Sequence, residues 1–140
     1  MTTPARHRDT VIAFVDGMHG GADDSALSPI LAENVVMFGP LDDSPVTGRD
    51  AVLRAIQAIG TVATHLAYDE VLSGTTHHAA HFRLQVDETV VDGVDYIRVD
   101  GDGKIAEVTI WWRPLPSGVR MQRRLASLLG MTPWELLTET

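Results

Sequence analysis

The chain lacks cysteine, long apolar segments and an excess of positive charge, and each absence removes a class of protein. Its 140 residues include no cysteine, which excludes disulfides, thiolate metal ligands and a cysteine nucleophile. No apolar run approaches the roughly 20 residues of a membrane span, and the start, MTTPARHRDT, has no apolar signal region. A formal charge of −8 argues against a broad nucleic-acid surface. We therefore expect no membrane or nucleic-acid partner and a cytoplasmic location.

The composition that remains is typical of one globular domain. Hydrophobic residues make up 44% of the chain and charged residues 21%, as in ordinary globular proteins. A chain of this length can bury a core and still enclose a small-molecule cavity. We treat residues 1–140 as a single domain, with a core at about 5–114 and a C-terminal helical extension over 115–140.

The first sixty residues show the apolar spacing of helices. Apolar side chains at intervals of three and four residues predict a helix over residues 5–19. A shorter helix is expected over 24–32, followed by a strand in ENVVMFGP. Thr47 stands three residues before Asp50, which is the spacing of a capping box and predicts the start of a third helix.

Beyond residue 60 the apolar pattern changes to alternation, which is typical of strands. Strands are expected near 62–73, 76–87, 90–99 and 104–113, with a hairpin turn at DGDG between the last two. Helices followed by an antiparallel meander predict an α+β fold.

The last part of the chain predicts further helix. Ser117–Leu129 has the pattern of an amphipathic helix that Gly130 ends, and Thr132-Pro133 is expected to cap a final turn. This extension could fold over a cavity mouth, act as a lid or pack on a second subunit, and the sequence leaves these alternatives open.

Two stretches, AENVVMFGPLDDSPVTGRDAV and DYIRVDGDGKIAEVTIWW, together with the order of elements, resemble the nuclear transport factor 2-like (SnoaL-like) superfamily. The closest likeness is to ketosteroid isomerase. The resemblance implies a cone-shaped fold, in which N-terminal helices wrap a curved, mostly antiparallel sheet. It also implies an apolar pocket at the mouth of the cone and frequent dimerisation through the outer face of the sheet.

The resemblance carries over to the isomerase's three functional positions only in part. The position of its protonated acid, before the aromatic of a motif like DxxRxDxxG, is Asp95. The position of its base, before a proline, is Gly39, and that of its helix tyrosine is Phe14. The aspartate of SnoaL-like polyketide cyclases would fall at Ile110. Because one group of three is present, we do not expect steroid isomerisation by that mechanism.

Asp95 is also conspicuous from the residues alone. In VDGVDYIRV, alternation places it on one face with apolar neighbours, where an unpaired carboxylate is costly. A buried carboxyl group must be protonated, paired with another polar group, or hydrated by water in a cavity. Two interpretations stay open. Asp95 could be a neutral hydrogen-bond donor or proton shuttle at the floor of a cavity, or a structural acid that is bonded to backbone amides or to a neighbour, or reached by water through a register irregularity at Gly93.

The histidine-rich run THHAAHFRLQV offers a partner for Asp95. Alternation places His78 on the same face as Phe82, toward the interior, where it could act as a base beside Asp95. The alternative is a histidine bonded to backbone or water. His77 and His81 would stand roughly 13 Å apart along a strand, too far to share one zinc ion. We therefore expect no metal and no cofactor.

Two further pairs depend on which way a strand faces. In TVATHLAYDEVL neither face is clearly apolar, so either His65 points inward as a rival base or Tyr68 points inward as a hydroxyl donor. Trp111 and Trp112 are adjacent and must face opposite sides. Parity places Trp112 in the cavity and Trp111 with Arg113 on the outer face, where we expect a homodimer contact.

We interpret the chain as a small cofactor-independent enzyme of the isomerase, cyclase or hydratase type. It would apply acid–base chemistry to an apolar, oxygenated small molecule, with Asp95 and His78 as catalytic residues. The alternative is a non-catalytic ligand-binding or dimeric interaction protein on the same scaffold. The residues expected to bind the ligand are Phe14, Met18, Met37, His65, Tyr68, Phe82, Val108, Ile110 and Trp112.

Overall fold

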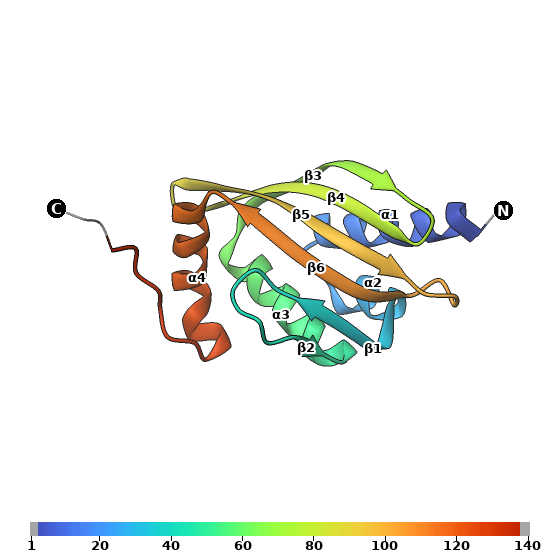
Figure 1. Cartoon of the computed structure of the whole chain (residues 1–140), viewed down its shortest axis with the longest axis horizontal. Helices are drawn as coiled ribbons and strands as arrows, with labels where there is room; N and C mark the ends of the chain where they lie inside the picture. The colour runs from blue at the N-terminus through green and yellow to red at the C-terminus, as the bar shows by residue number, and fades with distance from the viewer. Residues whose placement is uncertain (1–2, 138–140) are drawn as a thin grey trace.

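Six strands form one curved sheet in the order β2-β1-β6-β5-β4-β3 (Figure 1). The structure is a computed structural model that describes residues 3–137, with side chains from residue 5 onward. The strands are β1 (Leu31–Phe38), β2 (Val46–Thr47), β3 (Thr64–Ser73), β4 (His77–Val86), β5 (Thr89–Val99) and β6 (Ile105–Arg113). The helices are α1 (Thr3–His19), α2 (Asp24–Leu27), the 3-10 turn η1 (Ser28–Ile30), α3 (Arg49–Val62) and α4 (Leu115–Leu129).

The sheet is mostly antiparallel, as predicted. Strands β3 to β6 form a meander, while β1 runs parallel to β6 and carries β2 at its edge. Helices α1, α2 and α3 cover one face of this sheet, and α4 stands across one end (Figure 1). The α+β fold class and the four strands of the meander are confirmed, with each strand ending within two residues of its predicted bounds.

Apolar residues of the three N-terminal helical segments and of the sheet meet in one core. On α1, the predicted stripe of Val11, Phe14, Val15 and Met18 is buried, because residues three and four apart share a helix face. The inward positions of β4 and β5 are buried in the same way. Within residues 3–137 no helix is long and apolar enough to cross a membrane.

Three local predictions were wrong. The second helix ends at Leu27 and continues only as η1. Ser28 keeps helical backbone angles (φ −55°, ψ −43°), but Pro29 has no N–H to donate the next helical hydrogen bond. The capping box before α3 is absent: Thr47 belongs to β2, and Gly48 precedes the helix with a φ of 92° and no side-chain cap. No helical turn forms over residues 131–137.

The segment after α4 is held by a side chain instead of by a helical turn. Gly130 follows the end of α4, as predicted, and adopts the left-handed conformation with a φ of 68°. The buried Gln122 then donates a hydrogen bond to the carbonyl of Thr132 (2.9 Å) and accepts one from the backbone N–H of Trp134 (2.8 Å). Both ends of one amide group therefore fix this segment against α4.

The basic residues of α4 also have partners. Arg120 and Arg124 both pair with Asp87 in the turn between β4 and β5, and Arg123 donates to the carbonyl of Trp134. These contacts give the cluster a structural role, and they join α4 to the sheet and to the segment that follows it.

The outer face of the sheet carries aromatic side chains. Trp111 is 56% exposed there, and its ring lies 5.9 Å from that of Tyr96, which stacks on His77 at 5.2 Å. Trp111 thus faces outward and Trp112 inward, as alternation predicted. A homodimer contact through Trp111 and Arg113 stays a prediction.

Candidate active site

Asp95 lies in the middle of β5 with its side chain directed into the fold and only 4% of the residue exposed. Its cross-strand neighbours are Ala80 on β4 and Ile110 on β6, and the ladder is regular at Gly93. Burial raises the pKa of the Asp95 carboxyl to about 7, while a hydrogen bond from Tyr68 acts in the opposite direction. Burial therefore favours the protonated carboxyl far more than it would be favoured in an exposed aspartate.

Tyr68 on β3 supplies the polar partner of Asp95. Its hydroxyl donates a hydrogen bond of 2.5 Å to Oδ2 of Asp95. Burial, followed by the neighbouring Asp95, raises the pKa of Tyr68 well above its ordinary value, so the phenol keeps its proton. The site thus contains two hydrogen-bond donors, a phenol and a carboxylic acid, when Asp95 is protonated.

Aromatic packing fixes the Tyr68 ring. The rings of Phe14 and Phe82 lie 6.4 Å and 5.6 Å from it, and His19 accepts a hydrogen bond from the Tyr68 backbone N–H at 2.9 Å. Phe82 lies across Gly93, where a Cβ atom would come within 2.4 Å of the phenyl ring. A side chain at residue 93 would therefore push Phe82 against Tyr68.

The orientation of β3 decides between the two alternatives left open by its sequence. Tyr68 points inward, whereas His65 is exposed and adopts a φ of 55°. The register of β3 on β4 shifts between Thr64 and Ala67, so simple alternation does not hold along this strand. The prediction that His65 contributes to the cavity is wrong.

His78 does not pair with Asp95. It is fully buried and points inward, but it lies opposite Ile97, and its Nδ1 forms a 2.8 Å hydrogen bond with the Ser73 hydroxyl. That hydroxyl also accepts a hydrogen bond from Arg8 of α1. Burial, followed by the charges of nearby basic groups, lowers the pKa of His78. The predicted Asp95–His78 pair is therefore wrong, since His78 belongs to the contact between α1 and the sheet.

The other histidines of β4 have separate partners as well. His77 Nδ1 bonds with the Thr76 hydroxyl, while His81 on the outer face lies between Asp69 and Asp92, whose hydrogen bonds raise its pKa. Among residues 3–137 no group of three or more His, Asp or Glu side chains is arranged to hold a metal ion.

Asp95 and Tyr68 line a small inner cavity. Its volume is about 20 Å³, which is room for a single water molecule. Seven of the residues expected to bind a ligand lie in its wall. The lining consists of Phe14, Met18, Ile56, Ile59, Leu66, Tyr68, Phe82, Leu84, Asp95, Val108, Ile110 and Trp112.

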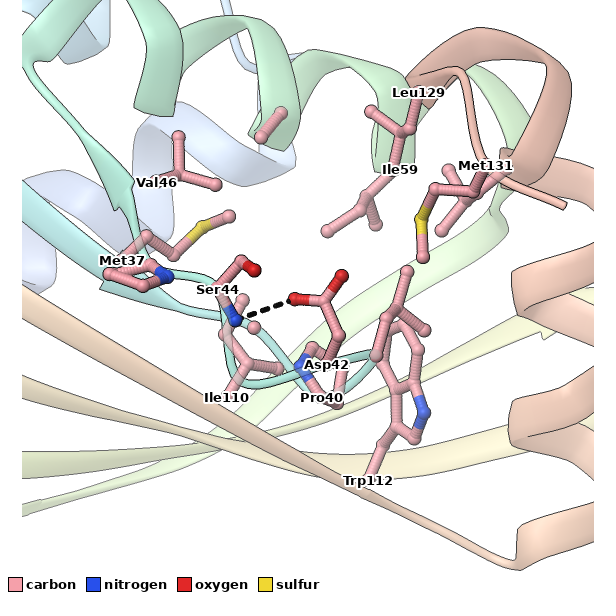
Figure 2. A pocket seen from close by; sticks show the side chains of 15 residues that line it. Met37, Pro40, Asp42, Ser44, Val46, Ile59, Ile110, Trp112, Leu129 and Met131 are labelled. Carbon is pink, nitrogen blue, oxygen red and sulfur yellow. Dashed lines mark hydrogen bonds between the residues drawn. The ribbon is translucent and has the colours of Figure 1, made fainter.

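A larger outer cavity has a volume of about 270 Å³ and shares part of its wall with the inner one. Figure 2 shows the side chains that line this outer cavity. The two cavities share Ile59, Ile110 and Trp112, so one layer of side chains separates the outer space from Asp95. Met37, another expected ligand contact, lines this outer cavity.

Sequence reasoning missed two polar groups in the outer cavity. Oδ1 of Asp42 accepts a 2.9 Å hydrogen bond from the backbone N–H of Ser44, and the second carboxylate oxygen points into the open space (Figure 2). Both residues lie in the loop between β1 and β2, where periodicity predicts nothing. The run DDS was the available signal, since aspartate favours a turn of this kind.

The C-terminal extension forms part of the wall of the outer cavity. Leu125, Leu129 and Met131 all line the cavity, and Met131 lies across from Trp112 (Figure 2). Of the alternatives for this extension, packing near the cavity mouth is therefore the one observed in the single chain.

Comparison with known proteins places this site in a family. The model of the SnoaL-like domain matches residues 6–108, which include both Tyr68 and Asp95. The chain belongs to the SnoaL-like family. This agrees with the resemblance seen in the sequence and with the curved sheet observed here.

Individual relatives carry names of enzymes. The chain is 27% identical over 116 residues to the steroid delta-isomerase of Nocardioides simplex, covering 79% of this chain and 92% of that protein. It is 29% identical to a solved steroid delta-isomerase of Pseudomonas aeruginosa, with a TM-score of 0.77 and coverage of 90% and 96%. A SnoaL-like polyketide cyclase structure from Jannaschia sp. CCS1 has the same fold, with a TM-score of 0.72 at 13% identity and coverage of 86% and 94%.

Proposed function

We propose that this protein is a cofactor-independent enzyme that performs acid–base chemistry on an apolar small molecule carrying a carbonyl oxygen. The observation that carries the proposal is the Tyr68–Asp95 pair, in which two potential donors meet inside an apolar wall. Hydrogen-bond donors fixed in a water-poor site stabilise negative charge that develops on a substrate oxygen, because no solvent must reorganise.

The inner cavity suits the oxygen atom of such a substrate. It has room for one water molecule beside Tyr68 and Asp95, and a carbonyl oxygen has a similar size. The carbon skeleton would occupy the outer cavity, whose wall is mainly apolar. To reach the donors, the carbonyl group would displace the side chains of Ile110 and Trp112, which separate the two spaces.

The relatives support an isomerase within this class. This proposal departs from the expectation drawn from Gly39 and Phe14, because Tyr68 on β3 brings a hydroxyl beside Asp95 that position 14 lacks. Two proteins named steroid delta-isomerase are 27% and 29% identical to this chain over most of its length. Moving a carbon–carbon double bond into conjugation with a carbonyl group passes through an enolate, whose oxygen needs donors of the kind that Tyr68 and protonated Asp95 provide. We therefore propose a β,γ-unsaturated ketone as the substrate class.

The test is turnover of two ketones, 3-cyclohexen-1-one and a 5-ene-3-ketosteroid, followed by the ultraviolet absorbance of the conjugated product. We expect Tyr68→Phe and Asp95→Leu each to lower kcat by about 100-fold, the usual effect of removing one oxyanion donor. Thr76→Val, a change on the surface away from both cavities, serves as the control.

The alternative, a non-catalytic binding protein, predicts a different result. It predicts that 2-tetralone, a ketone that can only accept hydrogen bonds at its oxygen, binds in a calorimetric titration while neither ketone above is converted. The presence of Tyr68 beside Asp95 favours the enzyme, because an acid alone in an apolar wall would have sufficed to hold a ligand hydroxyl.

A further inference from the structure

We propose that Asp42 is the catalytic base of this site, and that the proton it removes comes from a carbon next to the substrate carbonyl. The inference rests on the proposed function, because Tyr68 and Asp95 must hold the oxygen while Asp42 acts on the carbon. Among the residues that the structure describes, Asp42 and Asp95 are the acidic side chains that line these two cavities.

The position of Asp42 supports this role. The hydrogen bond from Ser44 N–H occupies one carboxylate oxygen and fixes the orientation of the group. The second oxygen points into the outer cavity, toward the space bounded by Ile59 and Met131 (Figure 2). A base in this orientation can approach a carbon atom without first breaking its own supporting contact.

Asp95 and Asp42 are assigned different roles because one is buried and the other is exposed. Asp95 is buried among apolar side chains, which favours its neutral, proton-donating form. Asp42 is a solvent-exposed loop residue at the rim of the outer cavity, where water stabilises a carboxylate. A substrate that passes between Ile110 and Trp112 would place its oxygen in the inner cavity, beside Asp95. Its carbon skeleton would lie in the outer cavity, beside Asp42.

The reaction balances without any further reactant. The Asp42 carboxylate takes a proton from the carbon next to the carbonyl group, and the electrons of that C–H bond form the enolate double bond. The carbonyl electron pair moves onto oxygen, which accepts a hydrogen bond from protonated Asp95 and a second from Tyr68, whose hydroxyl turns from Asp95 to the substrate. Asp42 then returns the proton to the far carbon of the conjugated enolate, which restores both the carboxylate and the carbonyl group.

The neighbouring acid offers a matched control. Asp43 is also exposed and lies in the same loop, but it does not line the cavity. Asp42→Asn and Asp43→Asn make the same change of charge one residue apart, so a long-range effect of charge would appear in both variants. Asp42→Glu keeps the carboxylate and tests whether a base at this site restores turnover.

The experiment measures conversion of 3-cyclohexen-1-one together with calorimetric binding of 2-tetralone. We expect Asp42→Asn to lower kcat by at least about 100-fold, in the range for loss of a general base, and to leave the Kd of 2-tetralone within threefold. We expect Asp43→Asn to match the wild type and Asp42→Glu to recover at least a tenth of its rate.

The possible results separate this inference from the proposed function. If Tyr68→Phe and Asp95→Leu abolish turnover while Asp42→Asn retains it within threefold, the base assignment is wrong and the proposed function stands. Equal losses in Asp42→Asn and Asp43→Asn would also overturn the assignment. If the wild type binds 2-tetralone and converts neither ketone, both proposals fail.

Discussion

The hydroxyl of Tyr68 and the carboxyl of Asp95 meet at 2.5 Å although β4 lies between their two strands. Tyr68 pairs with Phe82, and Asp95 pairs with Ala80, so the contact runs along the inner face of the sheet, over the intervening strand. A tyrosine is long enough to reach across because curvature of the sheet brings the inner ends of side chains together.

Burial of Asp95 makes the stability of the protein depend on pH. The native pKa of about 7 lies above the ordinary value of 3.8, so the folded chain binds more protons between these two pH values. Stability should therefore fall as the pH rises from about 4 to about 7 and stay lowered above it, by about 4 kcal/mol at most. Asp95→Asn should remove most of this slope, which urea unfolding at pH 5 and pH 8 would measure. An unchanged slope would contradict burial of the carboxyl.

Ligand binding should also depend on whether Asp95 is protonated. A ketone oxygen accepts hydrogen bonds, so 2-tetralone should bind best when Asp95 is protonated. Above a pKa of about 7 for Asp95, Kd should rise by up to tenfold for each pH unit. Calorimetric titrations from pH 5.5 to pH 8.5 test this. Asp95→Asn should show a flat profile, and a pH-dependent profile in this variant would assign the effect to another group.

Replacing Ile110 should join the two cavities. Ile110→Ala removes a side chain that both spaces share, and it should lower stability by about 2–5 kcal/mol, the usual cost of such a truncation. We expect it to tighten 2-tetralone binding because the ligand no longer has to displace the wall. Ile105→Ala is the control, since Ile105 is buried on the same strand but lines neither cavity. Weaker binding in Ile110→Ala than in Ile105→Ala would contradict a passage at this point.

The exposed Trp111 should form part of a homodimer interface. Sedimentation velocity at micromolar concentration should show a dimer for the wild type and a monomer for Trp111→Glu, because a charge there would be desolvated on association. Leu128→Glu is the control, since Leu128 is exposed to a similar degree on α4. A monomeric wild type, or dissociation in the control alone, would contradict an interface at Trp111.

Strand alternation predicted the features that depend only on which side of a regular strand a residue faces. It placed Asp95 and Trp112 inside and Trp111 outside, because β5 and β6 pair with little interruption. On β3 it left the inward face open, because neither face is clearly apolar; Leu66 and Tyr68 face the inner cavity, which is one of the two alternatives. The sequence therefore left open the residue that proved to be the partner of Asp95.

Other features required information that periodicity does not contain. Alternation showed that His78 faces inward, but not that α1 covers this part of the sheet and that Ser73 is its partner. Asp42 lies in an irregular loop, and Met131 follows the end of α4, so their meeting in one cavity depends on tertiary packing. The same holds for Gln122, whose buried amide fixes the final segment.

The family match ends at residue 108, whereas Leu129 and Met131 lie beyond it and still bound the outer cavity. Family members with the same tyrosine and aspartate in the inner cavity can therefore differ in the size of molecule that they admit, if their C-terminal segments differ. Exchanging residues 115–137 between such proteins would change the wall of the outer cavity while Tyr68 and Asp95 stay in place.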